Sequence, residues 1–389
     1  MTSAGEFEAL LAGLSEARPT AALQELRPLR RIAVLGAGPV GQALACECLA
    51  AECEVTLYTA FEPERAALAG PGAVTIRGEH LTGTYRLDAG GASAHAAPSA
   101  RAAPPGASAP SAPSSSQPAI ALRIGIDDAV AEADAILIAT PAIAHATCGG
   151  LLAGRLRAGQ LLVLIPGRAF GAVEVARSLR RFGAPELPTI VELAGAPYRV
   201  EAGDPGALTI TALNAEVAAA AIPNRATDEA VRRLRTILPM LSPARGVLET
   251  SFSDLSGVLD VAPALLRDAA AMISQIDEER RRVAFAYGVR ELPPAPPAAE
   301  RPPALERTDP RVHDALCCSL VALVSAGELA GIRTRAAAAM VDLGSVAGKL
   351  DYARHGRTLA SLGLDRFRPE EIRRALEGGD APLLEEALA

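Results

Sequence analysis

Three glycines with the spacing G-x-G-x-x-G lie near the amino terminus. In a dinucleotide-binding fold the first glycine makes a tight turn, the second lets backbone approach a pyrophosphate, and the third lets a helix pack closely on a strand. The phosphates then lie at the positive end of that helix, where a proline is also tolerated. The motif predicts cofactor binding by Gly36, Ala37, Gly38, Pro39, Val40 and Gly41.

The residues around the glycines strengthen this prediction. An apolar run of strand type from Arg31 precedes the motif, a helical pattern covers about 39–51, and a second strand-like run covers 54–59. A glycine motif alone is weak, but strand, turn, helix and strand in this order favour a dinucleotide site. The alternative is a structural glycine turn in a sheet that binds no nucleotide.

The sequence leaves open which dinucleotide binds. An acidic residue at the end of the second strand would bind the ribose of NAD, and this chain has Thr59 there. Glu62 and Arg65 follow closely. Glu62 could bind the free 2′-hydroxyl of NAD, and Arg65 could bind the 2′-phosphate of NADP. The cofactor is therefore expected to be NAD or NADP.

Composition limits the classes of partner. The chain has 389 residues, is 50% hydrophobic and carries a net charge of −7 without a basic block, which makes nucleic acid and anionic membranes poor partners. Lys349 is the only lysine, far from the glycine motif. We find no signal peptide and no apolar run of the ~20 residues that span a bilayer, so the cytoplasm is the expected location.

Six cysteines show neither C-x-x-C spacing nor histidine partners. Small buried thiols are therefore expected, and no metal site is predicted.

The chain divides into two predicted domains. Alternating strand and helix patterns over 31–247 indicate a Rossmann-type, doubly wound α/β sheet that is parallel, after a helical extension over 1–30. Within it, 89–119 is Ala/Ser/Pro/Gly low complexity and is expected to be a disordered surface insertion. The strand signal stops near 248, and 248–389 reads as an all-helical substrate domain with a proline-rich linker at 292–303. The cleft between the domains is the expected substrate site.

Residues at the carboxyl ends of parallel strands are candidates for ligand contacts. Thr140 and Pro141 follow one buried strand, and Pro166-Gly167-Arg168 follow the next. Thr140 and Pro141 are therefore predicted to lie at the cofactor.

Several segments resemble the octopine/nopaline (opine) dehydrogenases, over most of the chain from residue 31 to 364. They are A-D-A-I-L-I-A-T-P-A-I-A-H (133–145), L-I-P-G-R-A-F-G-A-V-E (164–174), V-L-E-T-S-F-S-D-L-S-G-V-L (247–259) and I-D-E-E-R-R-R-V-A-F-A-Y-G (276–288). The resemblance implies NAD(P)H-dependent reductive condensation of a 2-oxo acid with the amine of an amino acid or another amine, giving a secondary amine.

The departures from the family pattern fall on the chemistry. The family's general acid/base is a histidine followed by proline, and Asp260 stands at the matching place. Its carboxylate partner lies in a segment for which this chain offers His313 and Asp314. One hypothesis is that the pair is exchanged, with Asp260 facing His313. The alternatives are that Asp260 caps a helix and that His313 is an ordinary solvated residue.

Other residues have weaker assignments. Arg168, Arg199 and Arg311 are candidates to clamp a substrate carboxylate, although most arginines in this chain are expected to be surface charges. His145 matches a family histidine. It is expected either to lie near the nicotinamide or to be a helix residue whose ring nitrogens are hydrogen-bonded within the protein. Glu192 matches a family acidic residue near the cofactor or serves as a helix cap.

Two functional classes remain from the sequence. One is an oxidoreductase of opine-dehydrogenase type, and the other is a non-catalytic descendant that binds the nucleotide as a sensor or assembly partner. Reduction of a free ketone, as in ketopantoate reductases, ranks lowest because it needs a well-placed lysine. The substrates are not identified, and a homodimer is the assembly left open.

Overall fold

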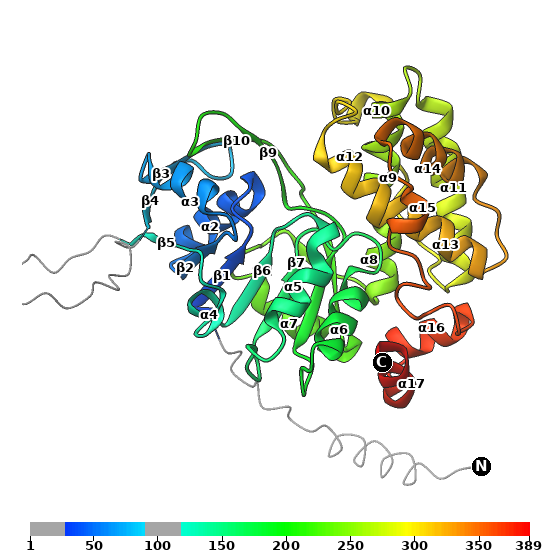
Figure 1. Ribbon diagram of the computed structural model, residues 1–389, viewed down its shortest axis with the longest axis horizontal. Helices are drawn as coiled ribbons and strands as arrows, with labels where there is room; N and C mark the ends of the chain where they lie inside the picture. The colour runs from blue at the N-terminus through cyan, green and yellow to red at the C-terminus, as the bar shows by residue number, and fades with distance from the viewer. Residues whose placement is uncertain (1–27, 90–117) are drawn as a thin grey trace, which may run out of the picture.

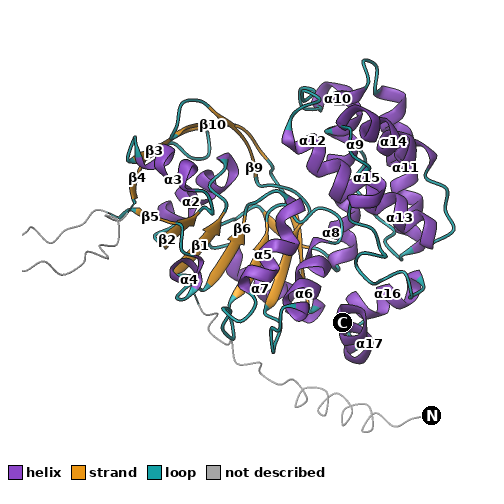
Figure 2. Ribbon diagram, viewed as in Figure 1, coloured by secondary structure: helices purple, strands orange, loops and turns teal. Residues whose placement is uncertain are grey.

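The computed structural model describes residues 28–89 and 118–389, and it contains a twisted sheet covered by helices, followed by a helical region (Figure 1; Figure 2). The predicted fold class, a Rossmann-type sheet followed by helices, is confirmed. The predicted extension at 1–30 and insertion at 89–119 lie almost wholly outside the described residues.

The described strands form one sheet in the order β12-β11-β8-β7-β6-β1-β2-β5-β4-β3-β10-β9. Their bounds are β1 Arg31–Leu35, β2 Glu54–Tyr58, β3 Ala73–Arg77, β4 Gly83–Asp88, β5 Ile120–Arg123, β6 Ala135–Ile138, β7 Leu161–Leu164, β8 Thr189–Leu193, β9 Tyr198–Ala202, β10 Ala207–Leu213, β11 Val217–Ile222 and β12 Leu241–Pro243. The sheet is parallel from β8 to β4. The expectation of a purely parallel sheet is wrong at both flanks, where β8–β11, β3–β4 and β9–β10 pair antiparallel.

Helices cover both faces of the sheet, as two separate apolar cores show. Ile32 and Val34 of β1 belong to one core, whereas Ala33 and Leu35 belong to the other, as alternation along a strand requires. On the first face lie α2 Pro39–Ala50, α3 Glu62–Ala69 and α7 Thr227–Leu234, the last preceded by η2 Asn224–Ala226. On the second lie α4 Ile126–Val130, η1 Ala142–Ala144, α5 His145–Leu152 and α6 Gly171–Arg181.

The second core continues into the helical region, so the two parts share a buried interface. The elements there are α8 Val247–Ser253, α9 Ser256–Leu259, α10 Val261–Leu265, α11 Ala270–Ala286, η3 Ala298–Glu300, α12 Pro310–Ala315, η4 Leu316–Leu320, α13 Val321–Leu329, α14 Arg335–Gly348, α15 Tyr352–His355, α16 Pro369–Leu376 and α17 Ala381–Leu388. Gly288, at φ +85°, follows the C-cap Tyr287 and ends α11 in the left-handed conformation that glycine favours.

The run from Pro310 to Leu329 is long and apolar enough to cross a membrane by composition, but 72% of its apolar window is buried inside the protein. This is the pattern of a core helix. All six cysteines are buried and free, as expected from the sequence.

The carboxyl-terminal helix returns to the first domain. Figure 1 shows α17 beside α6, where Arg180 Nη2 lies 2.7 Å from Glu385 Oε2. The helical region therefore contacts the sheet domain both where this region begins and where the chain ends.

Candidate active site

The glycine segment folds into the predicted turn between β1 and α2. Gly36 has φ +108°, and its N–H donates to Tyr58 O at 2.9 Å, which joins the turn to the end of β2. A Cβ added to Gly41 would lie 1.8 Å from Gly36 O, so only glycine fits where the helix crosses the strand. A Cβ at Gly38 would meet nothing within 4 Å. The open side of the turn is therefore at Gly38, where a pyrophosphate would approach the backbone.

The other predicted cofactor residues surround this turn. A Cβ at Gly36 would lie 3.1 Å from Thr140 Cγ2, which places the end of β6 against the glycines. Pro141 caps η1, and Thr59 is buried at the end of β2. Ala37 is buried and its carbonyl accepts from Gln42 Nε2 at 2.7 Å. Pro39 begins α2 and Val40 is half-buried. These residues fit a dinucleotide.

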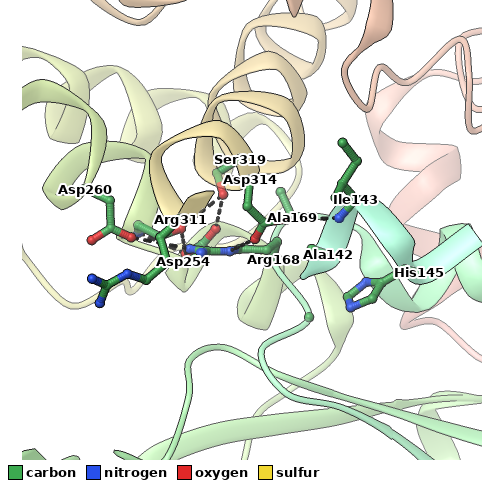
Figure 3. Close-up of polar contacts among 12 residues, drawn as sticks. Ala142, Ile143, His145, Arg168, Ala169, Asp254, Asp260, Arg311, Asp314 and Ser319 are labelled. Carbon is green, nitrogen blue, oxygen red and sulfur yellow. Dashed lines mark hydrogen bonds and ion pairs between the residues drawn. The ribbon is translucent and has the colours of Figure 1, made fainter. Parts of the chain in front are cut away.

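A second site lies where the sheet domain meets the helical region. Arg168, in the loop after β7, is surrounded by three carboxylates from the helical region (Figure 3). Its Nε donates to Asp314 Oδ2 at 3.0 Å, and its Nη1 lies 3.7 Å from Asp254 Oδ1 and 3.8 Å from Asp260 Oδ2. We call Arg168, Asp254, Asp260 and Asp314 the carboxylate cluster.

The loop that carries Arg168 is held in an unfavourable backbone conformation. Arg168 and Phe170 have φ of +58° and +60°, each costing ~1–3 kcal/mol for residues other than glycine. Ser251 Oγ accepts from Phe170 N at 2.9 Å, and Arg357 Nη1 donates to Ala169 O at 2.8 Å. The helical region thus fixes the loop that points Arg168 into the cluster.

Glu192 lies beneath the same loop. Its carboxylate accepts from Ala172 N, Thr250 Oγ1 and Ser251 Oγ, each at 2.8 Å. A Cβ on Gly167 would lie 2.1 Å from Glu192 Cγ, so glycine is required for the loop to cross this side chain. Burial raises the pKa of Glu192 to about 7, against the lowering effect of its hydrogen bonds. Glu192 therefore caps the first turn of α6 from a neighbouring strand.

Asp260 is the accessible member of the carboxylate cluster. Its side chain is 22% exposed, against 5% for Asp254 and 7% for Asp314. Burial raises the pKa of Asp260 to about 6, although Arg168 lowers it. A carboxyl group with this pKa exchanges protons near neutral pH, as a general acid/base must. Asp260 also lies at the junction of α9 and α10.

The predicted pairing of Asp260 with His313 is not formed. Among the described residues, His313 Nδ1 lies 2.9 Å from the Tyr352 hydroxyl and its Nε2 lies 4.0 Å from Cys317 Sγ. His313 and Asp314 are adjacent on α12, so their side chains leave the helix in directions about 100° apart. Asp314 reaches the cluster, and His313 points toward α15.

The three candidate arginines occupy different environments. Arg168 is buried and turned to protein carboxylates. Arg311 is exposed and makes two side-chain bonds to Asp309, at 3.0 and 2.7 Å. Arg199 is half-buried on β9, and with Arg311 it lowers the pKa of Asp260, although less than Arg168 does. Arg199 and Arg311 therefore supply positive charge near Asp260.

His145 is fully buried at the start of α5. Its Nδ1 lies 3.4 Å from Arg357 Nη2, and burial together with Arg357 and Arg168 holds its pKa well below the usual range. The imidazole is therefore neutral at pH 7, inside the interface between the two domains.

Sequence reasoning missed three contributors to this site. Asp254 Oδ1 accepts from Ser256 N at 2.9 Å at the start of α9 and also pairs with Arg168. Ser319 lies on the π-helical turn η4 and donates to Asp254 Oδ2. Arg357 bonds Glu174 and the backbone of the Arg168 loop. Only the resemblance of the S-F-S-D-L-S segment pointed toward Asp254, and nothing local marked Ser319 or Arg357.

Behind the carboxylate cluster is a cavity of about 20 Å³, lined in part by Phe170, Asp254, Arg280 and Ser319. This is room for about one water molecule. A substrate would therefore approach from the side of Asp260.

Comparisons with known proteins agree with the resemblance noted in the sequence. No family model matches the chain. An opine dehydrogenase from Arthrobacter sp. (strain 1C) is 28% identical over 289 residues, which cover 64% of this chain and 80% of that protein.

Solved structures share the fold at low identity. Octopine dehydrogenase with NADH and L-arginine has a TM-score of 0.61 and 14% identity, over 88% of this chain and 97% of that one. Yersinopine dehydrogenase with NADP⁺ has a TM-score of 0.58 and 12% identity, over 93% and 99%. A PanE/ApbA family ketopantoate reductase from Ralstonia eutropha JMP134 has a TM-score of 0.54 and 14% identity, over 81% and 97%.

Proposed function

We propose that the chain is of the opine dehydrogenase type, an NAD(P)-dependent dehydrogenase acting on CH–NH groups, as its similarity to an opine dehydrogenase and its shared fold with octopine dehydrogenase support. It condenses a 2-oxo acid with the amine of an amino acid or another amine and reduces the resulting imine. The products are a secondary amine, water and NAD(P)⁺. Solved structures with the same fold contain NADH or NADP⁺, which fit the proposed cofactor. Others contain L-arginine, agmatine or pyruvate, which fit the proposed amine and 2-oxo acid substrates.

The observation that carries the proposal is the position and pKa of Asp260. It matches the place of the family's catalytic histidine, it is the accessible carboxylate of the cluster, and burial raises its pKa to about 6. A histidine has an unperturbed pKa of ~6.5, so this aspartate supplies a proton over a similar pH range. Asp260 is thus the proposed proton donor and acceptor.

The proton steps follow from these two states of Asp260. Ionised Asp260 accepts a proton from the substrate ammonium group, and the free amine attacks the carbonyl carbon of the oxo acid. A proton moves from nitrogen to oxygen in the adduct to give the neutral carbinolamine. Protonated Asp260 then gives its proton to the carbinolamine hydroxyl, which leaves as water and creates the protonated imine (iminium). A nicotinamide cofactor held at the glycine turn by Gly36, Gly38 and Gly41 would supply the hydride that converts the iminium carbon to that of a secondary amine.

Arg168 and Asp314 keep this carboxyl group in place. Arg168 spans Asp260 and Asp314, so the carboxylate that matches the family's acidic partner acts through a guanidinium rather than by direct contact. Arg199 and Arg311 are the proposed clamps for the substrate carboxylates, because their charges face Asp260 from β9 and α12. His145 positions the interface and does not contact substrate.

The test is NAD(P)H oxidation with a panel of 2-oxo acids and amines, followed by variants of Asp260. Asp260→Asn lowers kcat/KM by roughly 10²–10⁴-fold, the usual contribution of a positioned acid/base. Asp260→His, with a side-chain pKa of ~6.5, retains more activity than Asp260→Asn. The matched control is His313→Gln, which leaves kcat/KM unchanged because His313 points away from the cluster.

The pH profile gives a second readout. In the imine-forming direction the amine arrives as its ammonium form and the required starting form of Asp260 is ionised, so kcat/KM falls below pH ~6 by up to tenfold per unit. The profile of Asp260→Asn with the same substrates lacks this step, and the ratio of the two profiles removes the ionisation of the amine. Identical profiles for both proteins would exclude Asp260 as the acid.

No turnover with any substrate pair, together with tight nucleotide binding, would instead favour a non-catalytic sensor or assembly partner. We propose a cytoplasmic location and leave a homodimer as the assembly to be tested by sedimentation.

A further inference from the structure

We infer that the adenosine end of the cofactor site selects NAD(H) over NADP(H), with Glu64 as the selecting residue. The inference rests on the proposed nucleotide site and concerns side chains at the end of β2. In Rossmann folds an acidic residue there binds the ribose 2′-hydroxyl of NAD, whereas an arginine accommodates the 2′-phosphate of NADP. This chain has Thr59 at that place.

Thr59 brings a carboxylate to this position from the following helix. Its hydroxyl is hydrogen-bonded to Glu64 Oε2, and it also accepts from Phe61 N at 3.1 Å. Thr59 itself is only 2% exposed, whereas Glu64 is half-buried and has a second carboxylate oxygen, Oε1, for a ligand. The threonine therefore anchors Glu64, five residues later, over the carboxyl end of β2.

The anchored carboxylate lies beside the glycine turn. Gly36 N donates to Tyr58 O at 2.9 Å, so the residue after Tyr58 is next to the turn that would hold the pyrophosphate. The adenosine ribose is bonded directly to that pyrophosphate and must lie at the same edge of the sheet. Glu64 is thus placed to accept a hydrogen bond from a ribose hydroxyl.

The neighbouring arginines are already paired with protein groups. Arg65 donates from Nε and Nη2 to Glu62, at 2.7 and 2.5 Å. Arg123, at the end of β5, donates from Nη1 to Asp88 O at 3.0 Å and lies 4.0 Å from the Asp88 carboxylate. Among the described residues, a 2′-phosphate would therefore meet the Glu64 carboxylate while both neighbouring guanidinium groups are paired with protein groups. The repulsion discriminates against NADP(H), while the hydrogen bond favours NAD(H).

The test measures dissociation constants of NADH and NADPH by fluorescence titration of the full-length protein. We expect NADH to bind at least roughly tenfold more tightly, the size of one lost charge-assisted hydrogen bond. Glu64→Gln weakens the binding of NADH and strengthens the binding of NADPH. The ratio of the two dissociation constants therefore moves toward one. Thr59→Val, which removes the anchor but no charge, narrows it in the same direction.

Glu54→Gln is the matched control. It makes the same charge change at an exposed residue that begins β2, at the opposite end of the strand, and leaves the ratio unchanged. Equal or tighter binding of NADPH by the unaltered protein would overturn the inference while leaving the proposed dehydrogenase intact. Failure of both nucleotides to bind would instead overturn the nucleotide site and the proposed function together.

Discussion

The glycine turn and the carboxylate cluster are built in opposite ways. The turn uses backbone from residues close in sequence, and two of its glycines, Gly36 and Gly41, are explained by what a Cβ would meet, whereas a Cβ at Gly38 would point into open space. The cluster uses side chains from residues 86 to 146 positions apart, and Arg168 joins them across the interface between the sheet and the helical region. Residues close in sequence fix the glycine turn, whereas packing between the two domains fixes the carboxylate cluster. Substitutions at the two sites should therefore have different effects on stability and on nucleotide binding.

The largest effect is expected in the glycine turn, where one substitution should disturb folding and another should disturb nucleotide binding. Gly41→Val places a side chain against Gly36 O, which is 1.8 Å from the Cβ position, and should destabilise the protein by more than ~4 kcal/mol. Gly38→Ala meets no atom within 4 Å and should leave the melting temperature unchanged while weakening NADH binding. Thermal unfolding and nucleotide titration measure the two effects. Unaltered NADH affinity in Gly38→Ala would show that the open side is not the phosphate site.

Removing the central cation tests the cluster as a structural unit. Arg168→Leu leaves three carboxylates without their countercharge and should lower the free energy of unfolding by ~3–5 kcal/mol. The loss should be greater at pH 8 than at pH 5, because Asp260, with a pKa of about 6, is mostly protonated and uncharged at the lower pH. Urea unfolding at both pH values measures this.

The control for that substitution is Arg311→Leu, which removes an arginine whose side chain is 54% exposed. An exposed ion pair contributes no more than ~1 kcal/mol, so stability should change little. Equal losses for both variants would mean that the cluster does not hold the domains together.

A smaller effect is expected at Glu192, with a defined dependence on pH. Its pKa rises from an unfolded value near 4.5 to about 7 in the folded protein, so the folded state binds more protons between these values. The free energy of unfolding therefore falls as pH rises from 4.5 to 7, by up to ~3 kcal/mol from this group.

Glu192→Gln removes this titration and can keep its partners, because Thr250 and Ser251 have hydroxyl groups that accept as well as donate. The stability of the variant should change less between pH 5 and pH 8 than that of the unaltered protein. A pH dependence identical in the two proteins would assign the titration to another group.

The smallest effect is expected at His313. His313→Gln loses one partly buried hydrogen bond, to the Tyr352 hydroxyl at 2.9 Å, and should cost less than ~1 kcal/mol. Thermal unfolding measures it alongside the activity assay. A loss of unfolding free energy as large as that expected for Arg168→Leu would mean that His313 is part of the interaction network of the site.

Much of the fold was predictable because its signals are local. Buried runs such as A-I-L-I in β6 and L-L-V-L in β7 are apolar throughout, as strands covered on both faces require. Other strands have no such local signal. β9 and β4 lie toward the far flank of the sheet and have mixed polar sequences, so pairing rather than composition makes them strands.

The site divides in the same way. The sequence alone determined the glycine turn, since its requirements are contained within six residues, and it drew attention to Asp260 and Asp314 through their places in familiar segments. Tertiary structure decided that Asp314 rather than His313 joins the cluster, that Arg168 contacts both Asp260 and Asp314, and that Glu64 is hydrogen-bonded to Thr59 at the end of β2. The direction of a side chain and the groups it meets depend on packing between distant segments, which no local pattern encodes.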